Sequence, residues 1–290
     1  KERMAITLRY VNDKGNVVES FLGVEHVTST TTISLKGTID TVLSRHGLSI
    51  SKCRGQGYDG DSNMNGEFNG LKTLILRENE SAYYIHCFAH QLQLALVVVA
   101  KRHSDISWFF NSVSNIVNIV GGSSKRHDAL LEAQAINVFK AIHDGELMTG
   151  QGLNQETSLA RASDTRWGSH YSTLISLINM FLAVISVLEW VRDDGTGGQK
   201  GVARGLLFLI QQFEFIFNLH LMRQVLSITS DLSQALQRKD QDIVNAMMLA
   251  DLSKKRLQLM RENWWDGFLG TLHPFVTVME LLFHRWRSYI

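Results

Sequence analysis

Two short polar turns hold the residues of this chain that are best suited to chemistry. The first is Gln56–Gly66 (QGYDGDSNMNG) and the second is Tyr84–His90 (YIHCFAH). Each has the pattern of a strand that ends in a polar turn and then opens a helix. In α/β proteins, ligands and catalytic groups gather at the carboxyl ends of strands. We therefore expect the site in these two turns, organised around Asp59.

Asp59 is the candidate for both catalysis and metal binding. It follows a predicted strand and precedes Gly60, which permits a sharp turn. A carboxylate there can project over the edge of the sheet and bind a hard divalent cation through oxygen. An aspartate in an Asp-Gly turn also commonly hydrogen-bonds its own backbone, and spacing alone does not separate the two roles. Asp61 would face the same side of an extended chain, where it either assists the cation or repels Asp59.

Cys87 and His90 form a C-x-x-H pair. The pair is a weak metal signal, because a structural zinc site needs four ligands and no second pair follows at zinc-finger spacing. The alternative is a buried thiol beside a histidine that caps a helix. His86 alternates with Cys87 along the predicted strand, so we expect it on the opposite face and outside the site.

Arg166 and Trp167 follow a polar loop and precede a predicted long helix. Such a pair can contact a phosphate through the guanidinium group and stack on a base through the indole. The same two residues are also typical of a helix entry, with the tryptophan in the core and the arginine at the surface. Spacing leaves both interpretations open.

The first third of the chain alternates strands and helices, and the rest is helical. Met4–Val11 and Val17–Val27 flank a turn and predict a β-hairpin. Apolar spacing then gives the order β-β-α-β-α-β-α, which predicts a mixed sheet with helices on its faces. Beyond it, apolar steps of three and four residues predict helices only. We therefore divide the chain into residues 1–104, with the α/β order, and a helical region, residues 105–290.

The helical region contains two predicted loops and one very apolar run. The loops are Glu146–Ser163 and Asp193–Gly201 (DDGTGGQKG), the second flexible by composition. Between them, Tyr171–Val191 predicts a long helix. Its run Phe181–Leu188 (FLAVISVL) is too short to span a bilayer, so we expect a buried helix segment and no membrane partner.

Composition is that of a folded protein with a substantial core. The chain has 290 residues, of which 44% are hydrophobic and 20% charged, and its formal net charge is +1. That charge gives no global attraction for nucleic acid, so a DNA-binding surface would have to be a local basic patch. Two cysteines cannot build a disulfide framework and suit the nucleus or the cytosol. The charged N-terminal residues have no signal-peptide pattern. We expect the chain to be part of a longer protein that is cut at this point.

Three motifs, in their order and spacing, resemble the hAT superfamily of DNA transposases. They are GYDGDSNMNG, HCFAHQLQLAL and, about 75 residues later, TRWGSH. The chain looks most similar to the plant and animal branch known as zinc-finger MYM-like proteins, or as TTF-type zinc finger proteins with an hAT dimerisation domain. The text KERMAITLRYVNDKGNVVESFLGV and the later RENWWD also look like this branch, so the resemblance covers residues 1 to about 268.

The resemblance implies an incomplete RNase H-like core followed by a large helical insertion. In such enzymes two Asp and one Glu hold two divalent ions, usually Mg²⁺, which drive phosphodiester cleavage and strand transfer. Asp59 matches the second Asp of the family. Cys87 and His90 match its C-x-x-H motif, so the resemblance implies a DNA-binding role for both. Arg166 and Trp167 match its Arg-Trp motif, which in the family is associated with the flipped base and the hairpin stage of excision.

Two of the three acids of that triad are not found in the sequence. The family's first Asp lies just upstream of the hairpin, where this chain begins. Its Glu lies in a serine-rich Ser-Glu-Arg context that is missing here, and neither Glu262 nor Glu280 aligns with it. Position 61, commonly Ala, is Asp. Because the zinc finger and the dimerisation segment are also missing, we expect a fragment truncated at both ends.

This fragment is predicted to be an inactive relative of DNA-cleaving transposases, because one carboxylate cannot position two ions. Mg²⁺ or Mn²⁺ would be the ancestral cofactors, with none bound tightly here. The alternative function is that of a non-catalytic protein-interaction or regulatory module that keeps the transposase fold. A third possibility is a decayed copy of a transposable element that has no function. DNA, protein partners and self-association are the candidate interactions, and the expected location is the nucleus, with the cytosol as the alternative.

Overall fold

The computed structural model describes residues 2–144, 159–162, 167–265 and 267–272. Contacts group the chain into two compact units, each with its own hydrophobic cluster. The first unit comprises Lys1–Leu94 and Ser233–Leu249, and the second comprises Ala95–Leu232 and Ala250–Ile290. The predicted division at residue 104 into an RNase H-like core and a helical insertion stays a prediction.

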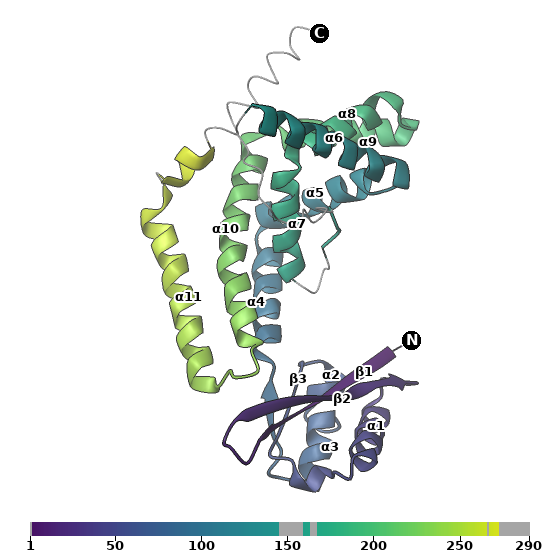
Figure 1. Ribbon diagram of the computed structural model, residues 1–290, viewed down its shortest axis with the longest axis vertical. Helices are drawn as coiled ribbons and strands as arrows, with labels where there is room; N and C mark the ends of the chain where they lie inside the picture. Colours follow the sequence, from purple (N-terminus) through teal and green to yellow (C-terminus); the bar gives the residue numbers. More distant parts are fainter. Residues whose placement is uncertain (1, 145–158, 163–166, 266, 273–290) are drawn as a thin grey trace. The chain divides into compact units, whose positions relative to one another are not determined.

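The first unit begins with the predicted β-hairpin. Strand β1 (Glu2–Val11) pairs in antiparallel fashion with β2 (Val17–Val27), as Figure 1 shows. Asn12 closes the turn, since its side-chain Oδ1 accepts the main-chain N–H of Lys14 at 3.0 Å. Gly15 has a φ of +78°, which glycine adopts without steric cost. The hairpin prediction is confirmed.

A segment of short helices and strands follows the hairpin and carries the candidate site. In order, its elements are α1 (Thr32–Arg45), the 3₁₀ turn η1 (Ile50–Lys52), β3 (Gly55–Tyr58), α2 (Ser62–Asn65), α3 (Leu71–Glu78), β4 (Tyr83–His86) and α4 (Phe88–Arg102). Strands β3 and β4 pair in parallel. The α/β order is confirmed, but the described strands form two separate two-stranded sheets instead of the single mixed sheet expected. The hairpin packs against α1 through its apolar side and does not hydrogen-bond to β3.

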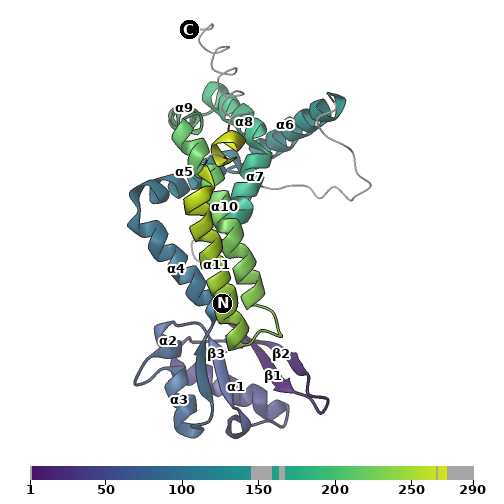
Figure 2. The same ribbon diagram turned by 90° about the vertical axis from the view of Figure 1, so that its left-hand side faces the viewer.

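The core of the first unit lies between α1, α3 and the strands. Helix α1 packs on β2 and on α3, and Figure 2 shows these elements grouped together. Lys36 braces the two helices, because its Nζ lies 2.8 Å from Asp40 in α1 and 2.6 Å from Glu78 in α3. The buried side chains of this core are Val27, Leu35, Leu43, Ile50, Leu71, Ile75 and Ala82.

The second unit is helical throughout its described secondary structure, as predicted. Its helices are the end of α4 from Ala95 onward, α5 (Ser104–Val120), α6 (Ser124–His143), α7 (Trp167–Asn179), α8 (Phe181–Asp194) and α9 (Gly197–Ile210), with most of α10 (Phe213–Leu236) and α11 (Ile243–Asn263). Helix α8 packs against α6 and α9, and α5 packs against α8 and α9. The apolar stripes that the sequence shows at helical spacing form this core.

Two predictions about the helical region are wrong. The helix predicted over Tyr171–Val191 breaks at Met180, where α7 and α8 meet at a bend of 80°. Met180 is fully buried, so packing holds the corner in place. The loop predicted over Asp193–Gly201 is mostly helix, since α9 begins at Gly197. The later residues of α9 bury an apolar face, and this burial outweighs the low helix propensity of glycine.

The very apolar run Phe181–Leu188 lies in α8 and is largely buried, as predicted. Of the described helices, none is by itself long and apolar enough to cross a membrane, although two bent pairs, α7 with α8 and α9 with α10, have the length and composition together. The predicted loop Glu146–Ser163 falls mostly outside the described residues.

Candidate functional site

The two polar turns meet at the carboxyl ends of β3 and β4. Because the strands are parallel, Tyr58 and His86 end them at the same edge. One further bond extends the ladder, since the main-chain N–H of Cys87 donates to the carbonyl of Tyr58 at 3.1 Å. Asp59 therefore leaves β3 beside the point where Cys87 leaves β4. This is the strand-end position predicted for Asp59, while its catalytic and metal-binding roles stay predictions.

A tyrosine from β4 ties down the turn that contains Asp59. The Tyr84 hydroxyl donates to the main-chain carbonyl of Asp59 at 3.0 Å. Burial, followed by the nearby charges of Asp59 and Cys87, raises the pKa of Tyr84, so this hydroxyl remains a donor at neutral pH. Within the described part of the chain, Oδ1 of Asp59 is buried and has no hydrogen-bond partner. That oxygen is left for solvent or a ligand to satisfy.

His86 belongs to this site, contrary to the expectation that it lies outside it. It alternates with Cys87 as predicted, but its side of β4 is the half-buried side that faces the Asp59 turn. The imidazole packs over Gly60, where an added Cβ would lie 2.6 Å from Cε1 and 3.0 Å from Nε2. Its Nε2 is buried without a hydrogen-bond partner among the described residues. The turn therefore brings together two unsatisfied polar side-chain atoms.

Sequence reasoning also missed Tyr84 and Lys72. The ammonium group of Lys72 lies 5.4 Å from the centroid of the Tyr84 ring, a cation–π contact worth about 0.5–1 kcal/mol at exposed sites. Beside them, the Tyr58 hydroxyl donates to Oε1 of Gln56 at 2.6 Å. Burial, followed by the charge of Tyr84, raises the pKa of Tyr58 well above its ordinary value. The two-residue step from Tyr84 to His86 was the available signal, because it places both side chains on one face.

Cys87 and His90 lie at the start of α4 in different surroundings: Cys87 is exposed to solvent, and His90 contacts another side chain. Cys87 is exposed, so the alternative of a buried thiol is wrong. Its carbonyl accepts the main-chain N–H of Gln91 at 3.0 Å, which places it just before the first turn of the helix. The ring of His90 lies against that of His86, with centroids 5.5 Å apart. His90 thus touches the Asp59 turn through His86, and DNA binding by Cys87 and His90 stays a prediction.

Other predicted residues are not brought to this turn by the described structure. Arg166 lies outside the described residues, and so does the side chain of Trp167, whose main chain begins α7. Asp61 is exposed and directly precedes α2. Glu262 lies in α11 within the second unit, and Glu280 lies outside the described residues. DNA binding by Arg166 and Trp167 therefore stays a prediction.

The described residues around Asp59 do not by themselves form a centre for two divalent ions, and the expected cofactors stay a prediction. Mg²⁺ demands a near-octahedral shell of oxygen ligands, and a two-ion centre shares several carboxylates between the ions. Across the described ranges, no group of three or more His, Cys, Asp or Glu side chains is placed to hold a metal ion. The neighbours that Asp59 does have are a phenol and an imidazole, which are suited to hydrogen bonding and packing.

Residues 1–70, which include the hairpin, α1, β3 and Asp59, match the family described as DUF4371, ZMYM1/FAM200 RNase-like domain. The first part of the chain is similar to an RNase-like domain. The chain is also 19% identical over 277 residues to the 52 kDa repressor of the inhibitor of the protein kinase of Homo sapiens, across 92% of this chain and 35% of that protein. The Mus musculus protein of that name is 19% identical over 279 residues, with the same coverage.

The chain thus spans about a third of the length of these two relatives. The matches agree with the RNase-like fold that the motifs around Asp59 imply, and the resemblance to hAT transposases stays a prediction. The match to the family ends before β4, so Tyr84 and His86 lie beyond it. The plant branch and the truncation at both ends stay predictions.

Proposed function

We propose that this chain is a transposase-derived, RNase-like module that acts in regulation by binding other molecules and does not cut DNA. The observation that carries the proposal is the surroundings of Asp59. Asp59 lies in a turn whose main-chain carbonyl accepts from Tyr84 and whose Gly60 packs against His86, and two-metal chemistry at this place would need a cluster of acids. In this proposal the strand-end geometry of the ancestral site is kept, while the described residues around it add no group of acids placed to hold an ion.

Protein contact is favoured over DNA contact as the main mode of binding. The formal net charge of +1 provides little of the phosphate neutralisation that dominates affinity for DNA. The human and mouse relatives carry the word repressor in their names, which favours a regulatory and nuclear role for this chain. In this proposal Cys87, His90, Arg166 and Trp167 descend from DNA-contacting motifs, and residual DNA affinity would come from them.

A plasmid-nicking assay tests the absence of cleavage. Supercoiled DNA is incubated with the purified chain and Mg²⁺ or Mn²⁺, alongside Asp59→Asn and the matched control Asp13→Asn, which changes an exposed aspartate in the hairpin turn. We expect no metal-dependent nicking above background from any of the three proteins. Nicking that disappears in Asp59→Asn but persists in Asp13→Asn would mean that the chain is a nuclease.

The salt dependence of DNA affinity tests the preference for protein contact. A protein that neutralises several phosphates loses affinity steeply as salt rises, with a slope of about −0.9 per phosphate contact in a log–log plot. We expect a shallow slope for this chain in fluorescence-anisotropy titrations with duplex DNA. A steep slope that flattens in Arg166→Gln would instead make DNA the main partner.

A further inference from the structure

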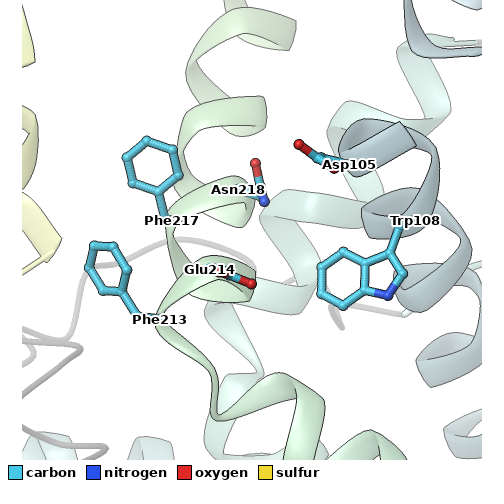
Figure 3. A pocket seen from close by; sticks show the side chains of 6 residues that line it. All are labelled: Asp105, Trp108, Phe213, Glu214, Phe217 and Asn218. Carbon is cyan, nitrogen blue, oxygen red and sulfur yellow. The ribbon is translucent and has the colours of Figure 1, made fainter. Parts of the chain in front are cut away.

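A cleft on the second unit combines aromatic and acidic groups. It has a volume of about 460 Å³, lies between α5 and α10, and is lined by Asp105, Trp108, Phe213, Glu214, Phe217 and Asn218. Figure 3 shows Glu214 and Asn218 turned from α10 toward Asp105 and Trp108 on α5, whereas Phe213 and Phe217 project from the other side of α10. Of the six lining side chains, those turned toward the space between the two helices are one indole, two carboxylates and one amide.

Buried neighbours fix the two walls of the cleft. Phe109 of α5 and Phe215 of α10 are both 0% exposed, and their ring centroids lie 5.4 Å apart. Each is adjacent in sequence to a group of the cleft, because Trp108 precedes Phe109 and Glu214 precedes Phe215. The core contact thus holds the two helices together beside the cleft. Such prior placement lowers the entropy that a ligand must overcome on binding.

Among the described residues, the acidic side of the cleft consists of two exposed carboxylates, Asp105 and Glu214. Asp105 accepts a hydrogen bond from the Ser104 hydroxyl at 3.1 Å, and neither Asp105 nor Glu214 forms an ion pair there. Each carboxylate lies in the first turn of its helix, where the helix dipole favours a negative charge. The dipole accounts for their stability at these positions. It leaves their oxygens free to accept further hydrogen bonds.

Trp108 supplies a flat surface beside these carboxylates. Trp108 is 41% exposed, whereas its neighbour Phe109 is fully buried in the core. An indole face attracts a cation through its quadrupole, and tryptophan is the strongest of the aromatic side chains in this respect. An exposed indole next to two unpaired carboxylates matches a planar cation that stacks and donates hydrogen bonds at once.

We propose that this cleft receives an arginine side chain from a protein partner. The guanidinium group would stack on the Trp108 indole and donate to Glu214 and Asp105, with the Asn218 amide as a further acceptor. Lysine fits less well, because its compact ammonium cannot stack as a plane and keeps its hydration more strongly. Phosphates and acidic peptides are disfavoured by the two carboxylates. The inference rests on the proposed binding role and names the chemistry of the partner.

The surface beside the cleft would hold the rest of the partner segment. Phe213 is 53% exposed and Trp265 is 40% exposed. The half-buried Phe217 ring contacts both of them. The Phe217 and Trp265 rings are stacked, with centroids 6.3 Å apart and an interplanar angle of 4°. Exposed aromatic residues beside an arginine pocket are the side-chain types in which protein interfaces are enriched. The partner segment is therefore expected to carry apolar residues near its arginine.

Peptide titration followed by NMR tests this inference on the full chain. The probe is an acetylated Gly-Ser-Arg-Leu-Gly peptide at millimolar concentration, compared with peptides that carry lysine, citrulline or glutamate in place of the arginine. The indole N–H signals of ¹⁵N-labelled protein report binding, and Trp108→Phe assigns the signal of Trp108. Glu214→Gln and Asp105→Asn remove one carboxylate each, and Glu132→Gln changes an exposed glutamate of α6 as the matched control.

The arginine peptide is expected to shift the Trp108 signal, with weaker binding by lysine and none by glutamate. Loss of either carboxylate should weaken binding by about fivefold, whereas Glu132→Gln should leave it unchanged. Equal binding of the arginine and citrulline peptides would overturn the inference, as would full affinity in Glu214→Gln. These results are independent of plasmid nicking, so failure of this inference is distinguishable from failure of the proposed function.

Discussion

Replacing Gly60 with alanine would place a methyl group in the space that the His86 ring occupies. The added Cβ would lie 2.6 Å from Cε1 of His86, well inside van der Waals contact. The backbone itself tolerates the change, because Gly60 is not among the described glycines with a positive φ. The substitution therefore measures one contact, the packing of the imidazole over the Asp59 turn.

The cost follows from how far the ring can move. His86 is half-buried, and its ring lies 5.5 Å from that of His90 and 6.5 Å from that of Tyr84, so rotation meets other side chains on either side. Overpacking of this kind typically costs about 1–3 kcal/mol. Amide hydrogens that exchange with solvent when this strand pair opens should therefore exchange about 5- to 150-fold faster in Gly60→Ala than in the wild-type chain.

Hydrogen exchange at the Cys87 amide is the appropriate readout, because this N–H donates to Tyr58 across the strand pair. A double-mutant cycle isolates the contact, since Gly60→Ala should cost little in a His86→Ala background. Gly37→Ala is the control: this helical glycine has open space around it, and alanine there should stabilise α1 by about 0.5–1 kcal/mol. Unchanged exchange in Gly60→Ala, or an equal loss with and without His86, would refute the packing.

One further prediction concerns the stability of the first unit, and another concerns the stability of the second. Lys36→Met should destabilise the first unit by about 1 kcal/mol, while Lys14→Met in the exposed turn should have no effect. Burial lowers the pKa of Lys36, but hydrogen bonds and charges from Asp40 and Glu78 outweigh burial and raise it above 10.5. The stabilisation should therefore be complete below about pH 10.5 and be lost as pH rises through the raised pKa; a loss on acidification from pH 9 to 7 would contradict it. Ser123→Ala should destabilise the second unit by about 1 kcal/mol in urea titrations followed by tryptophan fluorescence, because the Ser123 hydroxyl caps α6 by accepting the N–H of Arg126 at 3.3 Å. The control Ser124→Ala should stay within about 0.5 kcal/mol, and equal effects of the two changes would argue against the cap.

Local signals in the sequence were sufficient for the first unit's elements. Alternation of apolar and polar residues on both sides of the Asn12 turn predicted the hairpin, and an acid before Gly60 predicted the strand end at Asp59. These features depend on residues close in sequence. The separation of the strands into two sheets depends on how the hairpin packs on α1, and no local pattern encodes that choice.

The errors share a physical cause, which is tertiary packing. Met180 continues an apolar helical pattern, yet the chain turns there because both α7 and α8 bury their faces in one core. The glycines near Gly197 predicted a loop, but the buried face of α9 makes the segment helical. His86 was placed outside the site because the alternation of a strand does not say which of its two sides faces a site. Lys72 reaches Tyr84 from α3, a contact between elements that spacing within one element cannot predict.

The plasmid-nicking comparison of wild-type chain with Asp59→Asn and Asp13→Asn tests the central claim most directly, because it asks whether the carboxylate at the end of β3 still supports metal-dependent chemistry. We expect the same background level of nicking for all three proteins in Mg²⁺ and in Mn²⁺. Nicking by the wild-type chain that Asp59→Asn abolishes and Asp13→Asn preserves would contradict it.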